Sequence, residues 1–232
     1  MDAPASPAPL KVGLMVPANN TTMERELTAW LPAHSRCATL RIPRGAGLLT
    51  RETLPPYKAK ALELAATFSR DIDVVAYGCT AAGFIAGPEG EARLAGELAD
   101  ITGRPVVTTA RSMVAALQAA GARRIALVTP YSDEVNRNLC LFLAEGDIEA
   151  RRVSSLAAAD VDALGRITAR EVAQLARATM DDDCDALFIA CSQLPTYDIL
   201  ESLRAEFGRP AWSSIKATAW QALQAVEQAA RP

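Results

Sequence analysis

Two cysteines stand at equivalent places in two similar segments, "DVVAYGCT" and "DALFIACS". Cys79 and Cys191 each follow a short apolar run and precede a hydroxyl residue, Thr80 or Ser192. An apolar run of this length predicts a buried strand, and ligands bind at the carboxyl ends of parallel strands. A single cysteine at a strand end is usually a small buried hydrophobic residue. A matching pair favours two functional thiols.

Two thiols on opposite sides of a planar carbon can perform acid–base or nucleophilic chemistry. Backbone amides that follow a strand end stabilise a thiolate and lower the pKa of the thiol. Racemisation next to a carboxylate, decarboxylation through an enediolate, and cis–trans isomerisation by transient thiol addition all suit this arrangement. None of these reactions needs a cofactor or a metal, so we expect neither.

The residues that precede and follow the predicted strand ends supply candidate substrate-binding groups. Asn20 lies just after the first predicted strand, and Tyr131 lies at the corresponding place in the second half. Asn20 also suits helix capping, and Tyr131 also suits packing between lobes, so both alternatives stay open. The full set of candidates is Pro17, Asn20, Thr80, Tyr131, Ser192 and Gln193.

Strand-like runs alternate with helical patterns along the chain, which predicts an α/β fold with parallel sheets. A strand at 11–17 leads into a helix in "NNTTMERELTAWL", where Thr21 and Glu24 fit a capping box. Further strands are expected within 71–80, 104–110, 124–130 and 185–195, and helices at 54–68, 91–102, 112–121 and 135–146.

Three segments recur in the same order in the two halves of the chain. "RIALVTP" repeats "VGLMVP", Cys191 follows Cys79 by 112 residues, and a second segment beginning "GRP" follows the first by 105 residues. Such a duplication predicts two lobes related by a pseudo-twofold axis, with equivalent strand ends facing each other across a cleft. We expect one lobe at 1–112 plus 214–232, and the other at 113–213.

Composition excludes several classes of function for these 232 residues. The net charge of −3 provides no basic surface for nucleic acid or an anionic membrane. No apolar stretch is long enough to span a bilayer, and the first residues do not resemble a signal peptide. Five cysteines without a C-x-x-C pair indicate reduced thiols and a cytoplasmic protein. The single histidine, His34, excludes a histidine-rich zinc site.

Several motifs resemble the aspartate/glutamate racemase superfamily, and within it the maleate cis–trans isomerases and the related arylmalonate decarboxylases. These motifs are "VPANNTTMERE", "YGCTAAGF", "TPYSDEVNRN", "ACSQLPTYD" and "GRPAWSSIKATAWQAL", and the resemblance extends from residue 11 to about residue 228. It implies two Rossmann-like lobes, each with a mostly parallel sheet flanked by helices, and an active site between them. It also implies an enzyme without a cofactor that forms a homodimer or a larger homo-oligomer.

The resemblance also implies roles for individual residues. Cys79 would add to the double bond of maleate to give a succinyl-like thioether, and Cys191 would act as the acid and base. Asn20 and Tyr131 would bind carboxylates. Arylmalonate decarboxylases typically keep only the second thiol, so Cys79 favours an isomerase that converts maleate to fumarate. Val161 stands where the isomerases tend to have an asparagine, which indicates either a weaker carboxylate contact or a substrate with an apolar group.

Three alternatives to a maleate isomerase remain at this stage. Two belong to the same superfamily: an amino-acid or hydantoin racemase and an arylmalonate-type decarboxylase. The third is a noncatalytic protein that binds a small anion, and it does not require two thiols. The segment 43–56 is either a flap over the cleft or simply a long connection.

Overall fold

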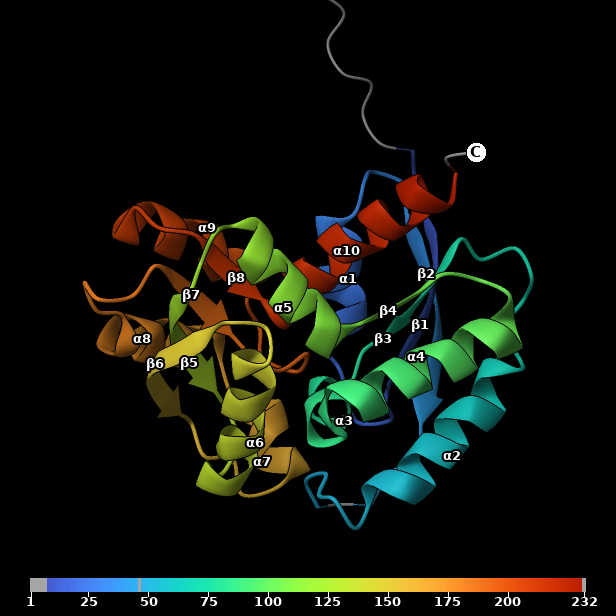
Figure 1. Cartoon of the computed structure of the whole chain (residues 1–232), viewed down its shortest axis with the longest axis horizontal. Coiled ribbons are helices and arrows are strands. Elements are labelled where there is room, and N and C mark those ends of the chain that lie inside the picture. The colour runs from blue at the N-terminus through green and yellow to red at the C-terminus, as the bar shows by residue number, and fades with distance from the viewer. Residues whose placement is uncertain (1–7, 46, 231–232) are drawn as a thin grey trace, which may run out of the picture.

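The computed structural model describes residues 8–45 and 47–230 and contains two parallel four-stranded sheets (Figure 1). The first sheet has the order β2-β1-β3-β4 and the second the order β6-β5-β7-β8. The strands are β1 (Lys11–Pro17), β2 (Arg36–Ile42), β3 (Val74–Tyr77), β4 (Val106–Thr108), β5 (Arg124–Thr129), β6 (Glu149–Ser155), β7 (Ala186–Ile189) and β8 (Ala211–Ser213). The predicted α/β fold with two lobes is confirmed.

Helices connect the strands and surround both sheets (Figure 1). They are α1 (Met23–Trp30), α2 (Leu54–Ala65), α3 (Thr80–Ile85), α4 (Gly87–Thr102), α5 (Thr109–Ala119), α6 (Asp133–Ala144), α7 (Val161–Arg166), α8 (Ala169–Thr179), α9 (Tyr197–Phe207) and α10 (Ser214–Ala229). Within the described part of the chain, no helix is both long and apolar enough to cross a membrane.

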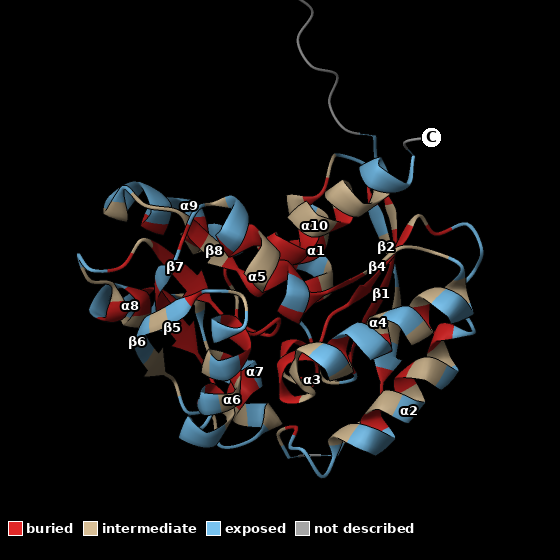
Figure 2. Cartoon of the chain, in the orientation of Figure 1, coloured by how far each residue is buried: buried red, intermediate tan, exposed pale blue. Residues whose placement is uncertain are grey.

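The two inner strands of the first sheet, β1 and β3, are buried on both faces. Val12 and Leu14 of β1 pack into a core with α1 and α10, whereas Met15 packs on the opposite face. That second core includes Tyr57 of α2 and Leu98 of α4. Side chains alternate across a strand, so a strand that is apolar on both faces is typical of a parallel sheet between two helical layers. Figure 2 shows the buried strands surrounded by helices whose outer faces are exposed.

The second sheet forms a core of its own that includes helices from the first half of the chain. Leu127 of β5 and Phe188 of β7 are fully buried in this core. Met113 and Leu117 of α5 and Phe84 of α3 join the same cluster. Helix α5 also packs against α10, and the two helices lie between the sheets in Figure 1. The lobes are therefore joined by shared apolar packing.

Both sheets have the same strand order, as the duplication predicts. In the first sheet β1 pairs with β2 on one side and β3 on the other, and in the second β5 pairs likewise with β6 and β7. The connections therefore run in opposite directions from β1 and from β5, which opens a crevice at the carboxyl edge of each sheet. The residues that follow β1, β3, β5 and β7 are placed at these two crevices.

One local prediction is wrong. Thr21 and Glu24 do not form a capping box, because α1 begins at Met23. The Thr21 hydroxyl instead accepts a hydrogen bond from Gln193, and Glu24 forms an ion pair with Arg41 at 3.1 Å. Both side chains are used in contacts with other elements, Gln193 in the second half of the chain and Arg41 on β2, which a local pattern does not reveal.

The predicted lobe boundaries, 1–112 plus 214–232 and 113–213, remain a prediction. The boundary between 112 and 113 falls inside α5, and the boundary between 213 and 214 falls where β8 ends and α10 begins. Residues 1–7 and 231–232 of the first lobe lie outside the described residues.

Candidate active site

Both cysteines line one small cavity between the two sheets, with a volume of about 50 Å³. Cys79 is 5% exposed and Cys191 is 8% exposed, so each thiol reaches the cavity from the edge of a packed core. The structure brings all of the sequence-predicted site residues to this cavity: Pro17, Asn20, Cys79, Thr80, Tyr131, Cys191, Ser192 and Gln193. Two halves of a duplicated chain therefore contribute to one site.

Cys79 lies where β3 ends and α3 begins. Its extended backbone, with a φ of −115°, leaves the amides of Ala81 and Ala82 directed at the thiol, where they lower its pKa. Gly78 precedes it in a place with no room for a side chain. A Cβ atom there would lie 2.5 Å from the sulfur of Met23 and 2.9 Å from a backbone oxygen. Close packing therefore fixes the strand end that carries the thiol.

Cys191 occupies the equivalent place after β7 but has a different backbone conformation. Its φ of 119° lies in a region that favours glycine and is strained for other residues. The Cys191 amide donates to the Ser214 hydroxyl at 3.0 Å, and that hydroxyl also accepts a hydrogen bond from Thr80 at 3.3 Å. Ser214, the first residue of α10, thus links the two loops that carry the thiols.

The environment of the thiols favours a single negative charge. Burial raises the pKa of both Cys79 and Cys191 above the ordinary value. Backbone amides of Gln193 and Leu194 lower the pKa of Cys191, whereas a charge on Cys79 raises it. Two nearby groups of this kind do not ionise independently. The pair therefore suits one thiolate that attacks or accepts a proton and one thiol that donates a proton.

Two tyrosine hydroxyls lie beside the thiols. Tyr131 lines the cavity and its hydroxyl lowers the pKa of Cys191, and Tyr57 on α2 lowers the pKa of Cys79 in the same way. Burial in turn raises the pKa of both phenols, so both remain protonated donors. Neither hydroxyl has another hydrogen-bond partner among the described residues. Tyr131 is therefore placed to donate to a thiolate or to a ligand oxygen in the cavity, and Tyr57 is placed to donate to the Cys79 thiolate.

Asn20 has a structural role at the rim of the cavity. Its Oδ1 accepts hydrogen bonds from the amides of Thr22 at 3.1 Å and Met23 at 2.9 Å, which satisfies donors at the start of α1. Its Nδ2 donates to the Ser192 hydroxyl at 3.2 Å. Both alternatives considered for Asn20 are thus compatible with the structure, because a residue that caps the helix also lines the cavity.

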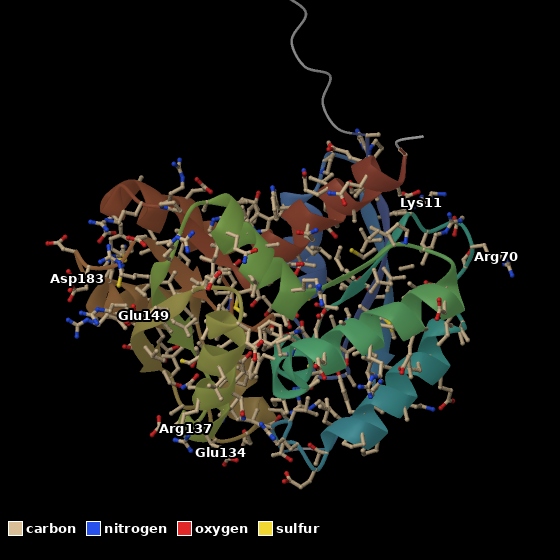
Figure 3. The ribbon with its side chains drawn as sticks, viewed as in Figure 1. Lys11, Arg70, Glu134, Arg137, Glu149 and Asp183 are labelled. Atoms are coloured by element: carbon tan, nitrogen blue, oxygen red, sulfur yellow. The ribbon has the colours of Figure 1, made fainter. Side chains whose placement is uncertain are left out.

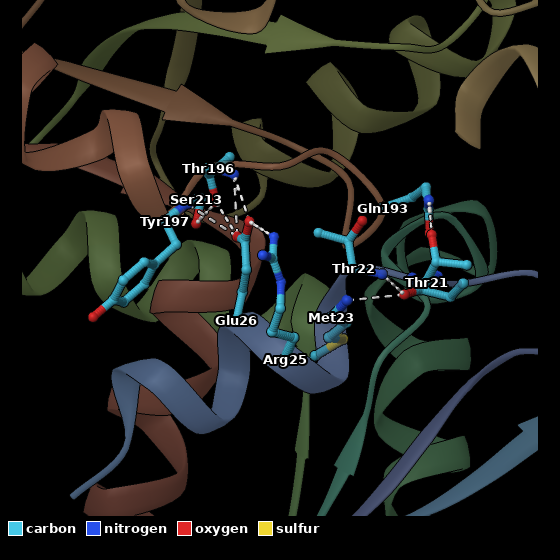
Figure 4. A network of polar contacts seen from close by, with 10 residues as sticks. Thr21, Thr22, Met23, Arg25, Glu26, Gln193, Thr196, Tyr197 and Ser213 are labelled. Carbon is cyan, nitrogen blue, oxygen red and sulfur yellow. Dashed lines mark hydrogen bonds and ion pairs between the residues drawn. The ribbon is translucent and has the colours of Figure 1, made fainter. Parts of the chain in front are cut away.

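The side chains of Ser192 and Gln193 connect the lobes. The Ser192 hydroxyl donates to the carbonyl of Gly78 at 2.6 Å. Gln193 accepts from the amide of Thr21 at 2.9 Å and donates to the Thr21 hydroxyl at 3.0 Å, as Figure 4 shows. These contacts hold the loop of Cys191 against the first lobe. For Ser192 and Gln193 the sequence suggested substrate binding, and the structure shows contacts between lobes.

A buried carboxylate extends this connection away from the cavity (Figure 4). Glu26 of α1 is 2% exposed and accepts hydrogen bonds from the amides of Thr196 and Tyr197 and from the Thr196 hydroxyl, at 2.9–3.1 Å. Burial raises the pKa of Glu26, and these hydrogen bonds partly oppose that effect. Glu26 thus satisfies the first amides of α9 from the other lobe.

Sequence reasoning missed several residues of the cavity wall. Arg44, Leu48 and Leu49 come from the segment between β2 and α2, so at least part of segment 43–56 covers the cavity.

Val161 is not among the lining residues. Leu164, one turn later on α7, lines the cavity instead. The other residues missed are Asn19, Ala81 and Val135. The segment that carries Arg44, Leu48 and Leu49 is irregular and gives no periodic signal, whereas Ala81, Val135 and Leu164 lie on helices, where an apolar residue suits the core as well as a cavity wall.

No cluster of three or more histidine, cysteine, aspartate or glutamate side chains in the described ranges is arranged to hold a metal ion. Cys184, within "DDDCD", is buried beneath the second sheet, and Cys140 lies on α6 outside the cavity.

Comparisons with known proteins find relatives of this chain in sequence and in fold. A family model described as arylmalonate decarboxylase matches residues 12–232. The maleate isomerase of Geobacillus stearothermophilus is 27% identical over 229 residues, which cover 93% of this chain and 91% of that protein.

Two solved structures are similar over almost the whole chain. A maleate isomerase from Pseudomonas putida has a TM-score of 0.84 and 27% identity, with 95% of this chain and 94% of that one covered. A Nocardia farcinica maleate cis–trans isomerase mutant with a covalently bound succinylcysteine intermediate has a TM-score of 0.85 and 25% identity, with 95% and 94% covered. With its duplicated sheets and the family match over 12–232, the chain belongs to the arylmalonate decarboxylase family.

Proposed function

We propose that the protein is a cofactor-independent isomerase that converts a small cis-dicarboxylate, with maleate as the leading candidate, to its trans isomer. One observation carries the proposal: Cys79 and Cys191 line the same cavity from equivalent strand ends. The similarity to maleate isomerases, one of them with a succinylcysteine intermediate, supports the same chemistry.

In this reaction Cys79 begins as the thiolate and Cys191 as the thiol. The Cys79 sulfur bonds to one carbon of the double bond while the π electrons move to the other carbon and its carboxylate. Cys191 gives its proton to that carbon, which leaves a succinyl thioether on Cys79. The central bond is now single and rotates.

The second half of the reaction reverses the first. The Cys191 thiolate removes a proton from the same carbon, the electron pair forms the trans double bond, and the carbon–sulfur bond breaks to restore the Cys79 thiolate. Proton transfer and nucleophilic attack by positioned groups are the two contributions that the site makes. The Tyr131 hydroxyl, buried and without another partner in the described structure, is proposed to donate to a carboxylate oxygen as charge moves onto it.

An arylmalonate-type decarboxylase is the second candidate. The cavity wall is largely apolar, with Leu48, Leu49, Val135 and Leu164, which suits a substrate that carries a hydrocarbon group. A decarboxylase that uses only the second thiol does not need Cys79, however, and Cys79 is built into the site. A racemase and a noncatalytic anion-binding protein remain as outcomes of the test.

The cytoplasmic location and the assembly as a homo-oligomer stay predictions.

The test compares the parent protein with Cys79→Ser, Cys191→Ser and Cys140→Ser. Each is incubated with maleate, and fumarate is measured by chromatography. We expect a loss of at least about a thousandfold for the first two variants and little change for Cys140→Ser, whose thiol lies outside the cavity. Intact mass analysis of Cys191→Ser should show one maleate added at Cys79.

Three further incubations separate the alternatives. Deuterium incorporated into the α position of L-aspartate in deuterated water indicates a racemase, and carbon dioxide released from phenylmalonate indicates a decarboxylase. Maleate binding without turnover of any of these compounds indicates a binding protein. Each of these results, with no fumarate formed, overturns the isomerase proposal.

A further inference from the structure

Arg44 is the one charged side chain among the described residues that line the cavity. It belongs to the segment between β2 and α2 and is half-buried. The charged side chains labelled in Figure 3 lie at the periphery, and the buried carboxylates Glu26 and Glu91 are not among the cavity-lining residues. The whole chain carries a net charge of −3, so its overall field does not attract an anion. An anionic substrate in this cavity therefore depends on local positive charge.

Two of the amide side chains that line the cavity, those of Asn20 and Gln193, already have partners. The Asn20 Nδ2 donates to Ser192 at 3.2 Å, and the Gln193 Nε2 donates to Thr21 at 3.0 Å. Arg44 differs, because one of its guanidinium nitrogens donates to the carbonyl of Gly47 at 2.5 Å and a guanidinium has five N–H donors in all. It is therefore the charged donor group with capacity left for a ligand.

The wall near Arg44 strengthens an interaction with an anion. Leu48 and Leu49 come from the same segment, and Leu164 lines the cavity from the other lobe. Apolar side chains exclude water, and a charged hydrogen bond is stronger where water is excluded. A guanidinium also matches the two oxygens of a carboxylate geometrically.

From this placement, and on the basis of the proposed function, we infer that Arg44 binds one carboxylate of the substrate and selects doubly charged ligands over singly charged ones. The same positive charge lowers the pKa of Cys79, so Arg44 also favours the thiolate form of the proposed nucleophile. One residue thus serves recognition of the dianion and preparation of the thiol.

The experiment measures binding apart from turnover. In a Cys79→Ser background, calorimetry gives the affinity for maleate and for maleamate, which has the same shape but one carboxylate replaced by an amide. Adding Arg44→Gln should weaken maleate binding about 10- to 100-fold and reduce the preference for maleate over maleamate by a similar factor. Arg44→Lys, which keeps the charge, should recover part of this preference.

Arg51→Gln is the matched control. Arg51 lies on the same segment and donates to Asn138 at 3.1 Å, away from the cavity. Its replacement removes the same charge and should leave the ratio of the two affinities unchanged. In the enzyme with Cys79 intact, Arg44→Gln should raise KM for maleate more than it lowers kcat.

The outcomes distinguish this inference from the proposed function. An unchanged ratio of affinities in Arg44→Gln overturns the inference even where the parent makes fumarate from maleate. A lost preference in Arg44→Gln, together with a parent that makes no fumarate, supports the inference and overturns the isomerase. If the Cys79→Ser protein binds neither maleate nor maleamate, the inference about Arg44 is overturned. The proposed isomerase activity is then still decided by whether the parent protein forms fumarate.

Discussion

Cys191 has a backbone φ of 119°, whereas Cys79, at the equivalent strand end, has a φ of −115°. The two thiols thus come from the same place in a duplicated topology but from different local geometries. Only Cys191 adopts a conformation that favours glycine, and its amide is held by Ser214. The strain at Cys191 has an energetic cost of about 1–3 kcal/mol that Cys79 does not have.

This difference predicts opposite effects of glycine at the two positions. Cys191→Gly should be more stable to urea than Cys191→Ala by about 1 kcal/mol or more, because glycine relieves the strain. Cys79→Gly should be less stable than Cys79→Ala, because there glycine only adds freedom to the unfolded chain. The same order of stability at both positions would contradict the assigned backbone geometry.

The tyrosine beside Cys79 predicts a pH effect on thiol reactivity. Burial raises the pKa of Cys79 and Tyr57 opposes this, so Tyr57→Phe should raise the pKa further. The rate at which iodoacetamide modifies Cys79 should increase as pH rises through and above the ordinary thiol pKa of about 8.5, and the variant should need a higher pH for the same rate. Mass spectrometry of the labelled peptides measures this rate. Tyr197→Phe, an exposed tyrosine outside the cavity, serves as the control.

The buried Glu26 predicts that the stability of the protein depends on pH. Glu26→Gln replaces an acceptor that faces the amides of Thr196 and Tyr197, which should cost about 1–3 kcal/mol. The pKa of Glu26 is raised in the folded protein, so the stability it contributes is complete below its ordinary pKa of about 4.3 and decreases as pH rises through the raised value. The difference in unfolding free energy between the parent and Glu26→Gln should therefore be larger at pH 4 than at pH 7.

Urea unfolding at several pH values measures this difference. Glu24→Gln, a change at an exposed position on the same helix, should have a much smaller effect at every pH. A difference that grows towards pH 7 would show that the Glu26 pKa is lowered rather than raised.

The position of Val161 predicts how the affinity for maleate can be changed. Val161 begins α7, one turn before Leu164, which lines the cavity, so the two residues share a face of the helix. Val161→Asn should bring an amide to the cavity edge and lower KM for maleate about tenfold. Asp162→Asn places an amide on the exposed face of the same helix and should leave KM unchanged. Equal effects of the two changes would show that α7 does not contact the substrate.

The architecture could be predicted from the sequence because the chain contains a duplication. The same pattern of strands occurs in both halves, so each occurrence supports the interpretation of the other. The strands β1, β3, β5 and β7 are short, apolar runs, and the residues that follow them gather at one cavity. By contrast, β2 and β6 were not predicted. Both are edge strands with mixed polar and apolar residues, "RCATLRI" and "EARRVSS", so their pairing depends on the neighbouring strand more than on their own pattern.

The roles of single side chains were harder to predict than their location. Ser192 and Gln193 lie at the cavity as expected, but their side chains bind Gly78 and Thr21 of the other lobe. Such contacts join residues more than a hundred positions apart, and no local pattern encodes them. Arg44 was missed for a related reason, because an irregular segment gives no periodicity from which the direction of a side chain can be inferred.

The crowding around Gly78 limits how this protein can be redesigned. Any larger residue there would push into Met23 and the neighbouring strand, and would move the carbonyl that receives the hydrogen bond from Ser192. Attempts to give the enzyme new substrates by directed evolution should therefore spare this position. They have more freedom along the leucine-lined side of the cavity, where a change of size does not disturb the junction between the two halves.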